Sequence, residues 1–222
     1  MILLVGGEKG GSGKTTVGCN LAVWLSKKGF DTLVLDADPQ ASASRFFERR
    51  NAAALNNITA LRKNGDLYTT ILSMAERFDM IVIDTGGRDS KELRTAMIAA
   101  DTFLIPTQPS QLDLELLPEL DETVGAAKDL NPQLRARCVI SRSPNYPSSS
   151  ETRDAKALIQ SLDNIGLCRQ AIKDRKIYRD AFIAGTGVIE TNNAKATAEI
   201  QLLAQELFEH ATPRASMQRA SA

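Results

Sequence analysis

Two lysines in one glycine-rich segment are the residues that most clearly suggest chemistry. Residues 7–16 read GEKGGSGKTT, close to a phosphate-binding pattern in which a glycine stands six places before a lysine. Glu8 holds the place of that glycine, and Lys9 follows it. Lys14 is placed to reach the β- and γ-phosphates of a nucleotide, and the Thr15 hydroxyl is placed to ligate Mg²⁺. Lys9 is an extra lysine that needs its own explanation.

Glycines give this segment its capacity to bind phosphate. They let the backbone close around an anion, and the following helix directs its first N–H groups and its dipole to the same point. From average residue usage, the letters KGGxGKTT arise by chance in about one in a million chains of this length. A glycine-rich turn without a ligand is therefore a weak alternative. The predicted nucleotide contacts in the loop are Lys9, Gly10, Gly11, Ser12, Gly13, Lys14, Thr15 and Thr16.

Three carboxylates stand where a metal-assisted reaction would need them. Asp84 ends the apolar run in DMIVIDT, an arrangement that holds Mg²⁺ through water in phosphate-loop proteins. Asp36 and Asp38 in LVLDADPQ follow another apolar run, and in extended chain they point to the same side. Ligands bind at the carboxyl ends of strands in such sheets. A turn remains the alternative, and it would be the first choice for Asp36 and Asp38 taken alone.

The elements that must position these residues alternate between strand and helix. The predicted strands are Ile2 to Val5, Thr32 to Leu35, Met80 to Ile83, Thr102 to Ile105 and Cys138 to Ile140, with a sixth at Leu167 to Ile172. The predicted helices are residues 15–28, 67–77, 90–100, 114–130, 151–162, 175–184 and 193–210, with Pro118 in the first turn of its helix. Strands that are apolar throughout indicate a sheet covered on both faces. The pattern predicts an α/β fold of three layers with a doubly wound, mostly parallel sheet.

Length and composition fit one domain. The 222 residues are 43% hydrophobic and 24% charged, as in ordinary globular proteins. We expect residues 1–210 to form a single domain and residues 211–222 to form a disordered tail. The segment SRSPNYPSSSE at 141–151 is predicted to be a loop.

Charge and cysteine usage exclude several classes of protein. The formal net charge is +0, so binding to nucleic acid requires a local basic patch. Cys19, Cys138 and Cys168 are widely separated and His210 is the single histidine, which argues against a zinc site or a disulfide framework. The first residues do not resemble a signal peptide, and no apolar run approaches the roughly 20 residues that span a bilayer. We therefore expect a cytoplasmic location.

Three motifs together resemble the ParA family of deviant Walker ATPases, which partition plasmids and chromosomes. They are KGGSGKTT at 9–16, LDADPQ at 35–40 and VIDT at 82–85. IPTQPSQLDL at 105–114 and DRKIYRDAFIAGTGVIE at 174–190 are similar to the short, ParF-like members. The resemblance covers residues 1–210. It implies the deviant Walker ATPase fold and a slow, Mg²⁺-dependent ATP hydrolase that a partner stimulates.

The resemblance also implies a role for each site residue. Lys14 would contact the phosphates, Thr15 would ligate Mg²⁺, and Asp38 would position the attacking water. Asp84 would support the metal from behind its direct ligands, and Asp36 would lie near the metal. The implied metal site thus comprises Thr15, Asp36, Asp38 and Asp84.

In that family, Lys9 would be the signature lysine, which crosses to the nucleotide of the partner subunit. Two cations directed at one phosphate group would repel, whereas two facing subunits give each lysine its own target. The resemblance therefore implies a homodimer with ATP and a monomer without it. The implied catalytic residues are Lys9, Lys14 and Asp38.

Two segments depart from the family pattern. Many members continue the strand of Asp84 with Asp-Thr-Pro-Pro, whereas here Gly86, Gly87 and Arg88 follow. The glycines predict a mobile switch loop, and Arg88 either approaches phosphate or the partner subunit or pairs with a nearby acid. VISRSPN places Arg142 near the position of an adenine-binding Asn in many members, so stacking of Arg142 on the base is predicted.

The densest basic stretch is RQAIKDRKIYR at 169–179, with five basic side chains and one acidic one. If these face one way they neutralise several DNA phosphates. A solvated helical face is the alternative. The resemblance favours nonspecific double-stranded DNA, because no helix-turn-helix domain precedes the phosphate loop in this sequence. The predicted contacts are Lys173, Arg175, Lys176 and Arg179, with Arg169 nearby, and Tyr178 is expected to pack.

The first functional hypothesis is a DNA partition ATPase on the nucleoid. Its ATP-bound dimer would bind DNA, a ParB-like or ParG-like adaptor would stimulate hydrolysis, and the ADP form would release. One alternative keeps the ATPase and changes the cargo to a cell-division, chemoreceptor or microcompartment cluster. Another is a MinD-like ATPase that cycles on membranes, which is disfavoured because the C-terminal 25 residues contain acidic residues and no basic amphipathic helix. A reductase like nitrogenase iron protein lacks cysteines at the required positions.

Overall fold

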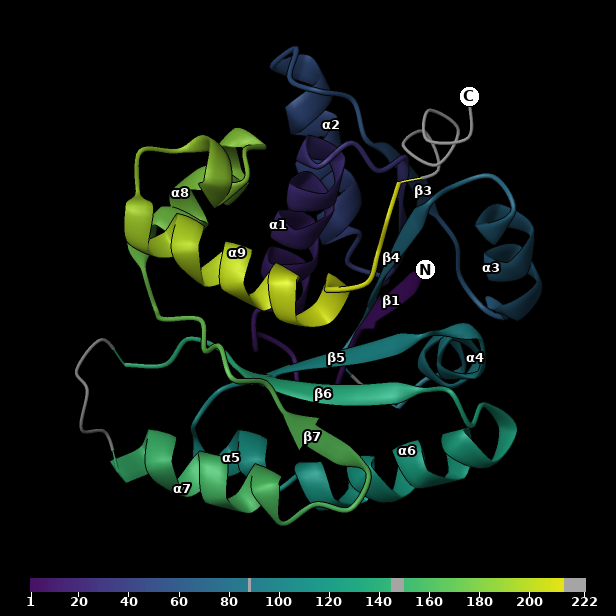
Figure 1. Ribbon diagram of the computed structural model, residues 1–222, viewed down its shortest axis with the longest axis vertical. Coiled ribbons are helices and arrows are strands. Elements are labelled where there is room, and N and C mark those ends of the chain that lie inside the picture. The colour runs from purple at the N-terminus through teal and green to yellow at the C-terminus, as the bar shows by residue number, and fades with distance from the viewer. Residues whose placement is uncertain (88, 145–149, 214–222) are drawn as a thin grey trace.

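Seven parallel strands form one sheet, and their spatial order differs from their order in the chain. The computed structural model describes residues 1–87, 89–144 and 150–213. Within these, the strands lie in the order β3-β2-β4-β1-β5-β6-β7 (Figure 1). Their bounds are β1 Ile2–Val5, β2 Thr32–Ala37, β3 Thr59–Arg62, β4 Met80–Thr85, β5 Thr102–Thr107, β6 Arg135–Ile140 and β7 Ile165–Leu167. The predicted doubly wound α/β fold is confirmed, and every strand pairing of the described chain is parallel.

Helices follow the strands along the chain. Their bounds are α1 Lys14–Lys27, α2 Ser42–Ala52, α3 Tyr68–Ala75, α4 Lys91–Ala99, α5 Gln111–Leu114, α6 Leu117–Leu130, α7 Ser150–Gln160, α8 Lys176–Ala184 and α9 Ala194–Phe208, with a 3₁₀ turn η1 at Val188–Glu190. Local chemistry sets several of these ends. The Ser90 hydroxyl accepts a hydrogen bond from the Leu93 N–H at 3.1 Å and so caps α4. Gly29, with φ of 88°, follows α1 where the sequence predicts its end.

Side chains on the strands alternate between two apolar layers. Leu3 and Val5 of β1 lie in one layer, and Ile2 and Leu4 lie in the other. β4 repeats the alternation, with Val82 in the first layer. Both faces of the sheet are therefore buried, which explains why the strand sequences are apolar throughout rather than alternating with polar residues.

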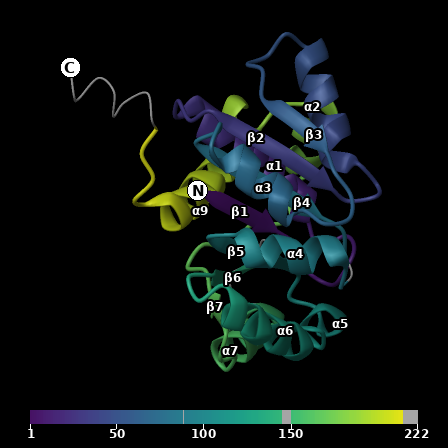
Figure 2. The same cartoon turned by 90° about the vertical axis from the view of Figure 1, so that its right-hand side faces the viewer.

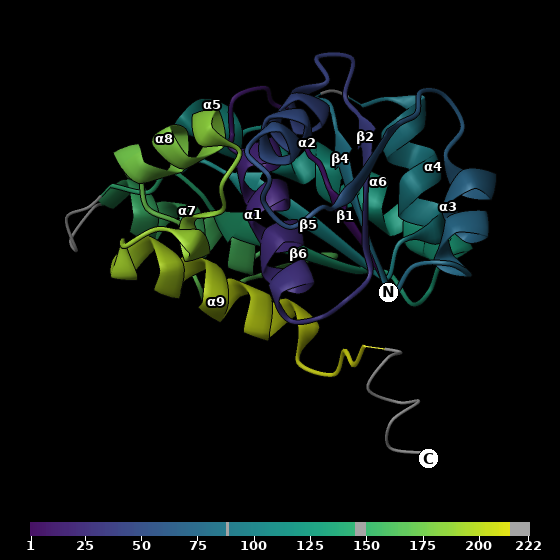
Figure 3. The same ribbon diagram turned by 90° about the horizontal axis from the view of Figure 1, so that it is seen from above.

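Two groups of helices cover the two faces. Helices α1, α2, α8 and α9 pack on one face, and α3, α4, α6 and α7 pack on the other (Figures 2 and 3). On the first face, the rings of Trp24 in α1 and Phe208 in α9 stack with centroids 6.2 Å apart. Phe46 in α2 packs on Phe182 in α8 with centroids 5.2 Å apart. Helices far apart in sequence are thus joined through aromatic contacts.

The helix predicted at residues 114–130 is two helices. Helix α5 ends at Leu114, and α6 begins at Leu117. Pro118 lies in the first turn of α6, as the sequence predicts. Because a proline has no N–H to donate to the carbonyl of residue 114, one continuous helix cannot run through this position. The break gives α5 a direction of its own, and α5 carries a residue that contacts the phosphate loop.

Other differences lie where the apolar signal is weak. Strand β3 was not predicted, because it is an edge strand whose four side chains are mostly exposed. Helix α2 was also not predicted, since its sequence SASRFFERRNA is mostly polar apart from its buried phenylalanine pair. The sixth predicted strand, residues 167–172, is displaced: the observed β7 is Ile165–Leu167.

Burial determines the chemistry of the three cysteines. Cys19, Cys138 and Cys168 are buried free thiols. Burial raises the pKa of both Cys138 and Cys168 to about 12, so these thiols are unreactive. In the part of the chain that the structure describes, none of the helices has the length and apolar character needed to cross a bilayer. Residues 145–149 of the predicted loop and residues 214–222 of the predicted tail lie outside the described residues.

Candidate functional site

A phosphate loop connects β1 to α1. Strand β1 ends at Val5, and α1 begins at Lys14. Gly11 and Gly13 have φ of 82° and 93°, in the left-handed region that residues with a Cβ rarely adopt. Gly13 directly precedes the first turn of α1, so the free N–H groups of that turn face the loop. The strand, the glycine turn and the helix follow one another as the sequence indicates.

A cleft of about 810 Å³ opens beside this loop. That volume lies within the roughly 300–1,000 Å³ of typical small-molecule sites. Its lining brings together predicted residues from four separate segments: Gly10, Gly11, Gly13, Lys14, Thr15, Thr16, Asp38, Gly86, Gly87 and Arg142. Two other predicted contacts, Lys9 and Ser12, line a separate, small cavity against α5 and α6. The cleft therefore unites most of the predicted nucleotide contacts, while Lys9 lies elsewhere.

The side chain of Lys14 folds back onto its own loop. Its Nζ donates a hydrogen bond to the carbonyl oxygen of Lys9. Burial lowers the pKa of Lys14, and the charges of Asp84 and Asp38 oppose that shift. An anionic ligand would bind this ammonium group more strongly than a neutral carbonyl does, because hydrogen bonds between charged groups are stronger. Lys14 is thus positioned to transfer from the loop backbone to a phosphate.

Asp84 is a buried carboxylate at the end of β4. It is 1% exposed, and neither carboxylate oxygen has a hydrogen-bond partner of good geometry among the described residues. Burial raises the pKa of Asp84 to about 8, although the nearby Thr15 hydroxyl opposes the shift. An unpartnered buried carboxylate is costly, and a cation would relieve that cost. Asp84 and Thr15 therefore fit a hydrated Mg²⁺.

The number of available ligands also suits Mg²⁺ bound together with a nucleotide. Among residues 1–87, 89–144 and 150–213, no cluster of three or more His, Cys, Asp and Glu side chains could hold a metal ion on its own. Mg²⁺ commonly binds through one or two protein groups, with water and substrate phosphates completing its coordination. A metal that arrives with a nucleotide needs no larger cluster.

Asp36 lies beside Asp84 in the sheet but uses its oxygens differently. The two residues are partners in the register of β2 and β4. Oδ2 of Asp36 accepts hydrogen bonds from the N–H and the hydroxyl of Ser44, both at 2.7 Å. Oδ1 accepts from the N–H of Asp38 at 3.2 Å. Asp36 therefore ties the first turn of α2 to the end of β2. The resemblance implied that Asp36 lies near the metal.

Asp38 follows β2 and lines the cleft. Its Oδ1 accepts a hydrogen bond from the Gln40 N–H at 2.8 Å, and its carbonyl oxygen accepts one from the Ala41 N–H at 2.8 Å. These bonds form a turn, the alternative that the Asp-Pro-Gln sequence left open. The turn and the site are compatible, because the turn fixes the carboxylate at the edge of the cleft.

Gly87 packs directly on the backbone of the phosphate loop. A Cβ added to Gly87 would stand 2.6 Å from the nitrogen of Gly10 and 2.6 Å from the carbonyl carbon of Lys9. A side chain at this position would therefore push the segment after β4 away from the loop. The sequence suggests a mobile switch here, and the structure adds a packing requirement for glycine. Arg88, which follows, lies outside the described residues.

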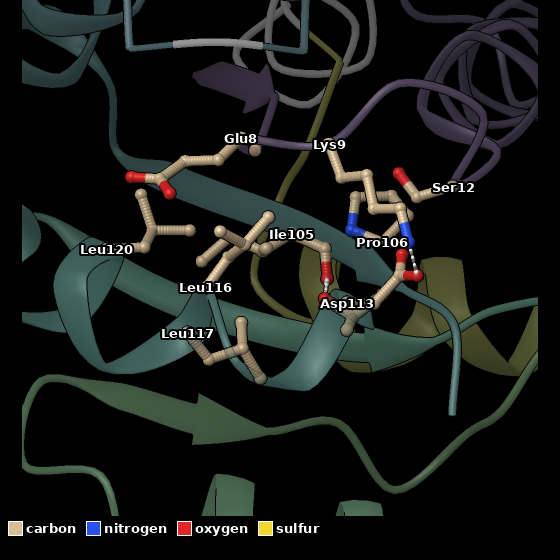
Figure 4. A pocket seen from close by; sticks show the side chains of 11 residues that line it. Glu8, Lys9, Ser12, Ile105, Pro106, Asp113, Leu116, Leu117 and Leu120 are labelled. Carbon is tan, nitrogen blue, oxygen red and sulfur yellow. Dashed lines mark hydrogen bonds and ion pairs between the residues drawn. The ribbon is translucent and has the colours of Figure 1, made fainter. Parts of the chain in front are cut away.

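Lys9 extends toward Asp113 of α5 (Figure 4). Its Nζ lies 2.6 Å from Oδ2 of Asp113, a side chain that is 3% exposed. The Ser110 hydroxyl donates a hydrogen bond to the same oxygen at 2.6 Å. The sequence did not single out Asp113, because the helix there was predicted to begin one residue later. The available signal was Ser-x-x-Asp at residues 110–113, a spacing typical of a helix start.

The basic stretch at residues 169–179 is not a single basic face. Arg175 turns inward and donates two hydrogen bonds to Oε1 of Glu199, at 2.7 and 2.9 Å. The Tyr178 hydroxyl donates to Oε2 of the same carboxylate at 3.0 Å, so Tyr178 packs as expected. Lys173 turns toward the loop after β6, and its Nζ donates to the Ser143 hydroxyl at 2.9 Å. Arg175 and Lys173 are thus engaged inside the protein.

The remaining cations of this stretch face solvent. Lys176 and Arg179 have side chains that are 81% and 60% exposed. Each pairs with an acid nearby in sequence, Asp180 at 3.1 Å and Asp174 at 3.0 Å. Arg169 is also exposed. Exposed pairs of this kind contribute little to stability and exchange readily for other partners.

Arg142 stands at the edge of the cleft. It is exposed and has φ of 48°, an unusual conformation for a residue with a side chain. It lines both the cleft and a small neighbouring cavity of about 40 Å³ next to Lys173 and Arg179. Arg142 therefore borders the same cleft as the phosphate loop.

Known proteins are similar to this chain in sequence and in fold. Residues 3–200 match the model of the CobQ/CobB/MinD/ParA nucleotide binding domain. Maintenance of carboxysome distribution protein A from Halothiobacillus neapolitanus is 29% identical over 210 residues, which cover 93% of this chain and 95% of that protein.

Two solved structures show the same fold. The apo McdA structure from Cyanthece has a TM-score of 0.76 at 18% identity, covering 93% of this chain and 98% of that one. A putative plasmid partition protein from Borrelia burgdorferi B31, bound to AMPPNP, has a TM-score of 0.72 at 20% identity, covering 94% and 98%. At these identities the likeness concerns the fold.

Proposed function

Because this chain belongs to the CobQ/CobB/MinD/ParA nucleotide-binding family, we propose that it uses ATP to position an intracellular cargo along DNA. It is an ATPase of the ParA/MinD type, and ATP and Mg²⁺ are its cofactors. In the proposed cycle, ATP joins two copies of the chain, and the dimer binds DNA without sequence preference on the nucleoid. An adaptor on the cargo stimulates hydrolysis, and the ADP form releases the DNA.

The observation that carries the proposal is the divergence of two lysines from one loop. Lys14 remains within the loop, whereas Lys9 leaves it toward α5. One phosphate group needs only the first of these cations. A second cation directed out of the loop suits the nucleotide of a facing subunit, and mutual contacts of this kind would make dimerisation depend on ATP.

For hydrolysis, the groups of the chain divide between binding, orientation and charge. The loop N–H groups and Lys14 bind and orient the phosphates. The Thr15 hydroxyl would hold Mg²⁺ and the Asp84 carboxylate would support it, and the ion when bound would supply positive charge against the phosphate oxygens. Asp38 orients the attacking water from the edge of the cleft. Arg142 stacks on the base.

Two kinds of cargo fit this cycle. The relative from Halothiobacillus neapolitanus matches along nearly its whole length and is named for carboxysome distribution, which favours a large protein assembly. DNA partition is the second candidate, favoured by segments 105–114 and 174–190, which are similar to the short partition ATPases. The ATPase site is the same for both, so the adaptor decides between them.

The exposed cations around α8 are the proposed DNA contacts. Lys176, Arg179 and Arg169 face solvent, and their surface pairs open at low cost. The sequence predicts Arg175 and Lys173 as DNA contacts as well. We do not include them here, because both side chains form hydrogen bonds within the protein.

Duplex DNA binding with ATP, with ADP and without nucleotide tests the proposal. We expect binding with ATP alone, equal affinity for unrelated sequences, and a steep fall in affinity as salt is raised. Anionic vesicles in the same assay test the MinD-like alternative. Binding of vesicles but not DNA with ATP would favour that alternative, and DNA binding that ignores the nucleotide would contradict the proposed cycle.

A further inference from the structure

The side chain of Lys9 is held on its own subunit by a prepared acceptor. Lys9 is partly exposed, with 33% of its side chain accessible, whereas Asp113 is almost fully buried. The Lys9 Nζ contacts Oδ2 of Asp113 (Figure 4). The Ser110 hydroxyl donates a hydrogen bond to the same oxygen and so fixes it. A carboxylate that is held by its own helix is oriented before Lys9 arrives. The ion pair is therefore a specific docking position for the lysine.

The backbone at Lys9 is held as well. Lys14 donates a hydrogen bond to the Lys9 carbonyl oxygen, and Gly87 packs against the peptide that joins Lys9 to Gly10. A phosphate that draws Lys14 away removes one of these contacts. The side-chain pair with Asp113 does not involve Lys14, so the Lys9 side chain stays held when that backbone contact is lost.

The negative charge of Asp113 opposes the release of Lys9. Asp113 acts electrostatically on Lys14 as well as binding Lys9. Burial and neighbouring carboxylates raise the pKa of Glu8, which shows that the surroundings of Lys9 are acidic. When Lys9 leaves, Asp113 remains as a buried charge without its cation. Release of Lys9 therefore needs a strong competing anion.

We propose that Asp113 is a positioning residue that stores Lys9 on its own subunit and thereby sets the ATP concentration at which two subunits join. In the resting chain, Asp113 holds the lysine away from the dimer. When ATP is bound in a facing subunit, its phosphates compete for Lys9, and the ion pair breaks. This inference rests on the proposed ATP-dependent dimerisation.

The variant Asp113→Asn tests storage directly, because it removes the charge and nearly preserves the size of the side chain. Dimer formation by the full chain is measured by light scattering as ATP is raised. We expect the ATP concentration at half-maximal dimerisation to fall about 10-fold, the change expected for loss of one partly buried ion pair. Glu115→Gln, which neutralises an exposed carboxylate two residues away, is the matched control and should leave this concentration unchanged.

Affinity for ADP separates storage from a general charge effect. Storage acts on Lys9, which is not used when one subunit binds ADP, so the ADP dissociation constant of Asp113→Asn should change less than about twofold. A gain in ADP affinity as large as the gain in dimerisation would mean that Asp113 only repels phosphate, and it would overturn the inference.

Ser110→Ala keeps the inference testable if Asp113→Asn does not fold. Loss of the Ser110 hydrogen bond loosens the carboxylate, so the ATP requirement should fall by about twofold to threefold. A wild type that dimerises with ATP, together with unchanged or higher ATP requirements in both variants, would overturn storage alone. A wild type that stays monomeric with ATP would overturn the proposed function and storage together.

Discussion

Charged side chains gather in the phosphate cleft and in the basic stretch 169–179, and these two regions treat charge in opposite ways. Beside the cleft, Asp84 is buried at the end of β4, and neither of its oxygens has a hydrogen-bond partner of good geometry within the described chain. Lys14 is bound to a neutral carbonyl oxygen. In the basic stretch, Arg175 forms a double hydrogen bond with the buried carboxylate of Glu199, and Arg179 pairs with an acid.

The difference shows how a ligand-binding charge can be told from a structural one. The presence or absence of a partner within the protein is more informative than the number of charged residues in a segment. Folding leaves a buried charge without a partner only at a cost, so such a charge is explained best by a ligand. A buried charge with a full set of partners is explained by the fold. On this criterion the cleft binds a ligand, while Arg175, in the densest basic stretch of the sequence, supports the structure.

The largest expected effect is that of Lys14→Ala on ATP binding. Loss of the charged contact with the phosphates should weaken ATP affinity by about 1,000-fold, while the empty protein remains folded. Titration calorimetry measures the affinity, and Lys28→Ala, at the far end of the same helix, is the control. A loss of ATP affinity below about 10-fold would mean that Lys14 is not a principal contact of the ATP phosphates.

Arg175→Ala should destabilise the fold. Its removal leaves Glu199, which is 7% exposed, buried without its cation, and this should cost about 2–4 kcal/mol. Arg179→Ala breaks an exposed pair and should cost less than about 0.5 kcal/mol. Urea unfolding of both variants measures the difference. Equal, small losses would show that the whole stretch is a solvated face.

Asp84→Asn tests the unpartnered carboxylate without nucleotide or metal. The pKa of Asp84 is about 8 in the folded protein against an ordinary value of 3.8, so the folded state holds the proton more tightly. Its stabilising contribution is complete below about pH 4 and is lost as the pH rises to about 8.

The wild type should therefore lose stability relative to Asp84→Asn across this window, by up to about 1 kcal/mol per pH unit. Thermal unfolding between about pH 5 and 9 measures the two slopes. Parallel slopes would mean that Asp84 is already ionised at low pH and has an unrecognised partner.

The smallest expected effect is on DNA binding. Lys176→Ala combined with Arg179→Ala should weaken duplex binding at low salt by about threefold to 10-fold and reduce the salt slope by up to about 2. Arg153→Ala with Lys156→Ala, an exposed pair on α7, is the control. Undiminished binding would place the DNA contacts on another surface.

The phosphate loop could be predicted from the sequence because its function depends on neighbouring residues. Gly11 and Gly13 supply the positive φ that the turn needs, and Lys14 opens the helix that follows. Asp84 was identified for the same reason, since the apolar run before it defines a strand that ends there. Each of these signals lies within a few positions of the residue concerned.

Partners far apart in the sequence could not be predicted. Asp113 binds Lys9 across 104 positions, and Arg175 meets Glu199 across 24. Neither pair leaves a local pattern, because the packing of α5 on the loop and of α9 on α8 brings them together. The sequence therefore indicated five cations in one stretch but could not tell which of them turn inward.

The position of β1 in the sheet has a consequence for how the protein is made. Strand β1 is first in the chain, yet its partners are β4 and β5, with Ile2 opposite Ile81 and Leu3 opposite Thr102. Pairings over such separations form slowly, because a long segment must close before they contribute. During synthesis, the phosphate loop is among the first segments to leave the ribosome, but the strand that anchors it has no neighbour until β4, which ends at residue 85, has followed, and it gains its second neighbour only with β5, which ends at residue 107. The earliest residues of the chain thus acquire their structure late.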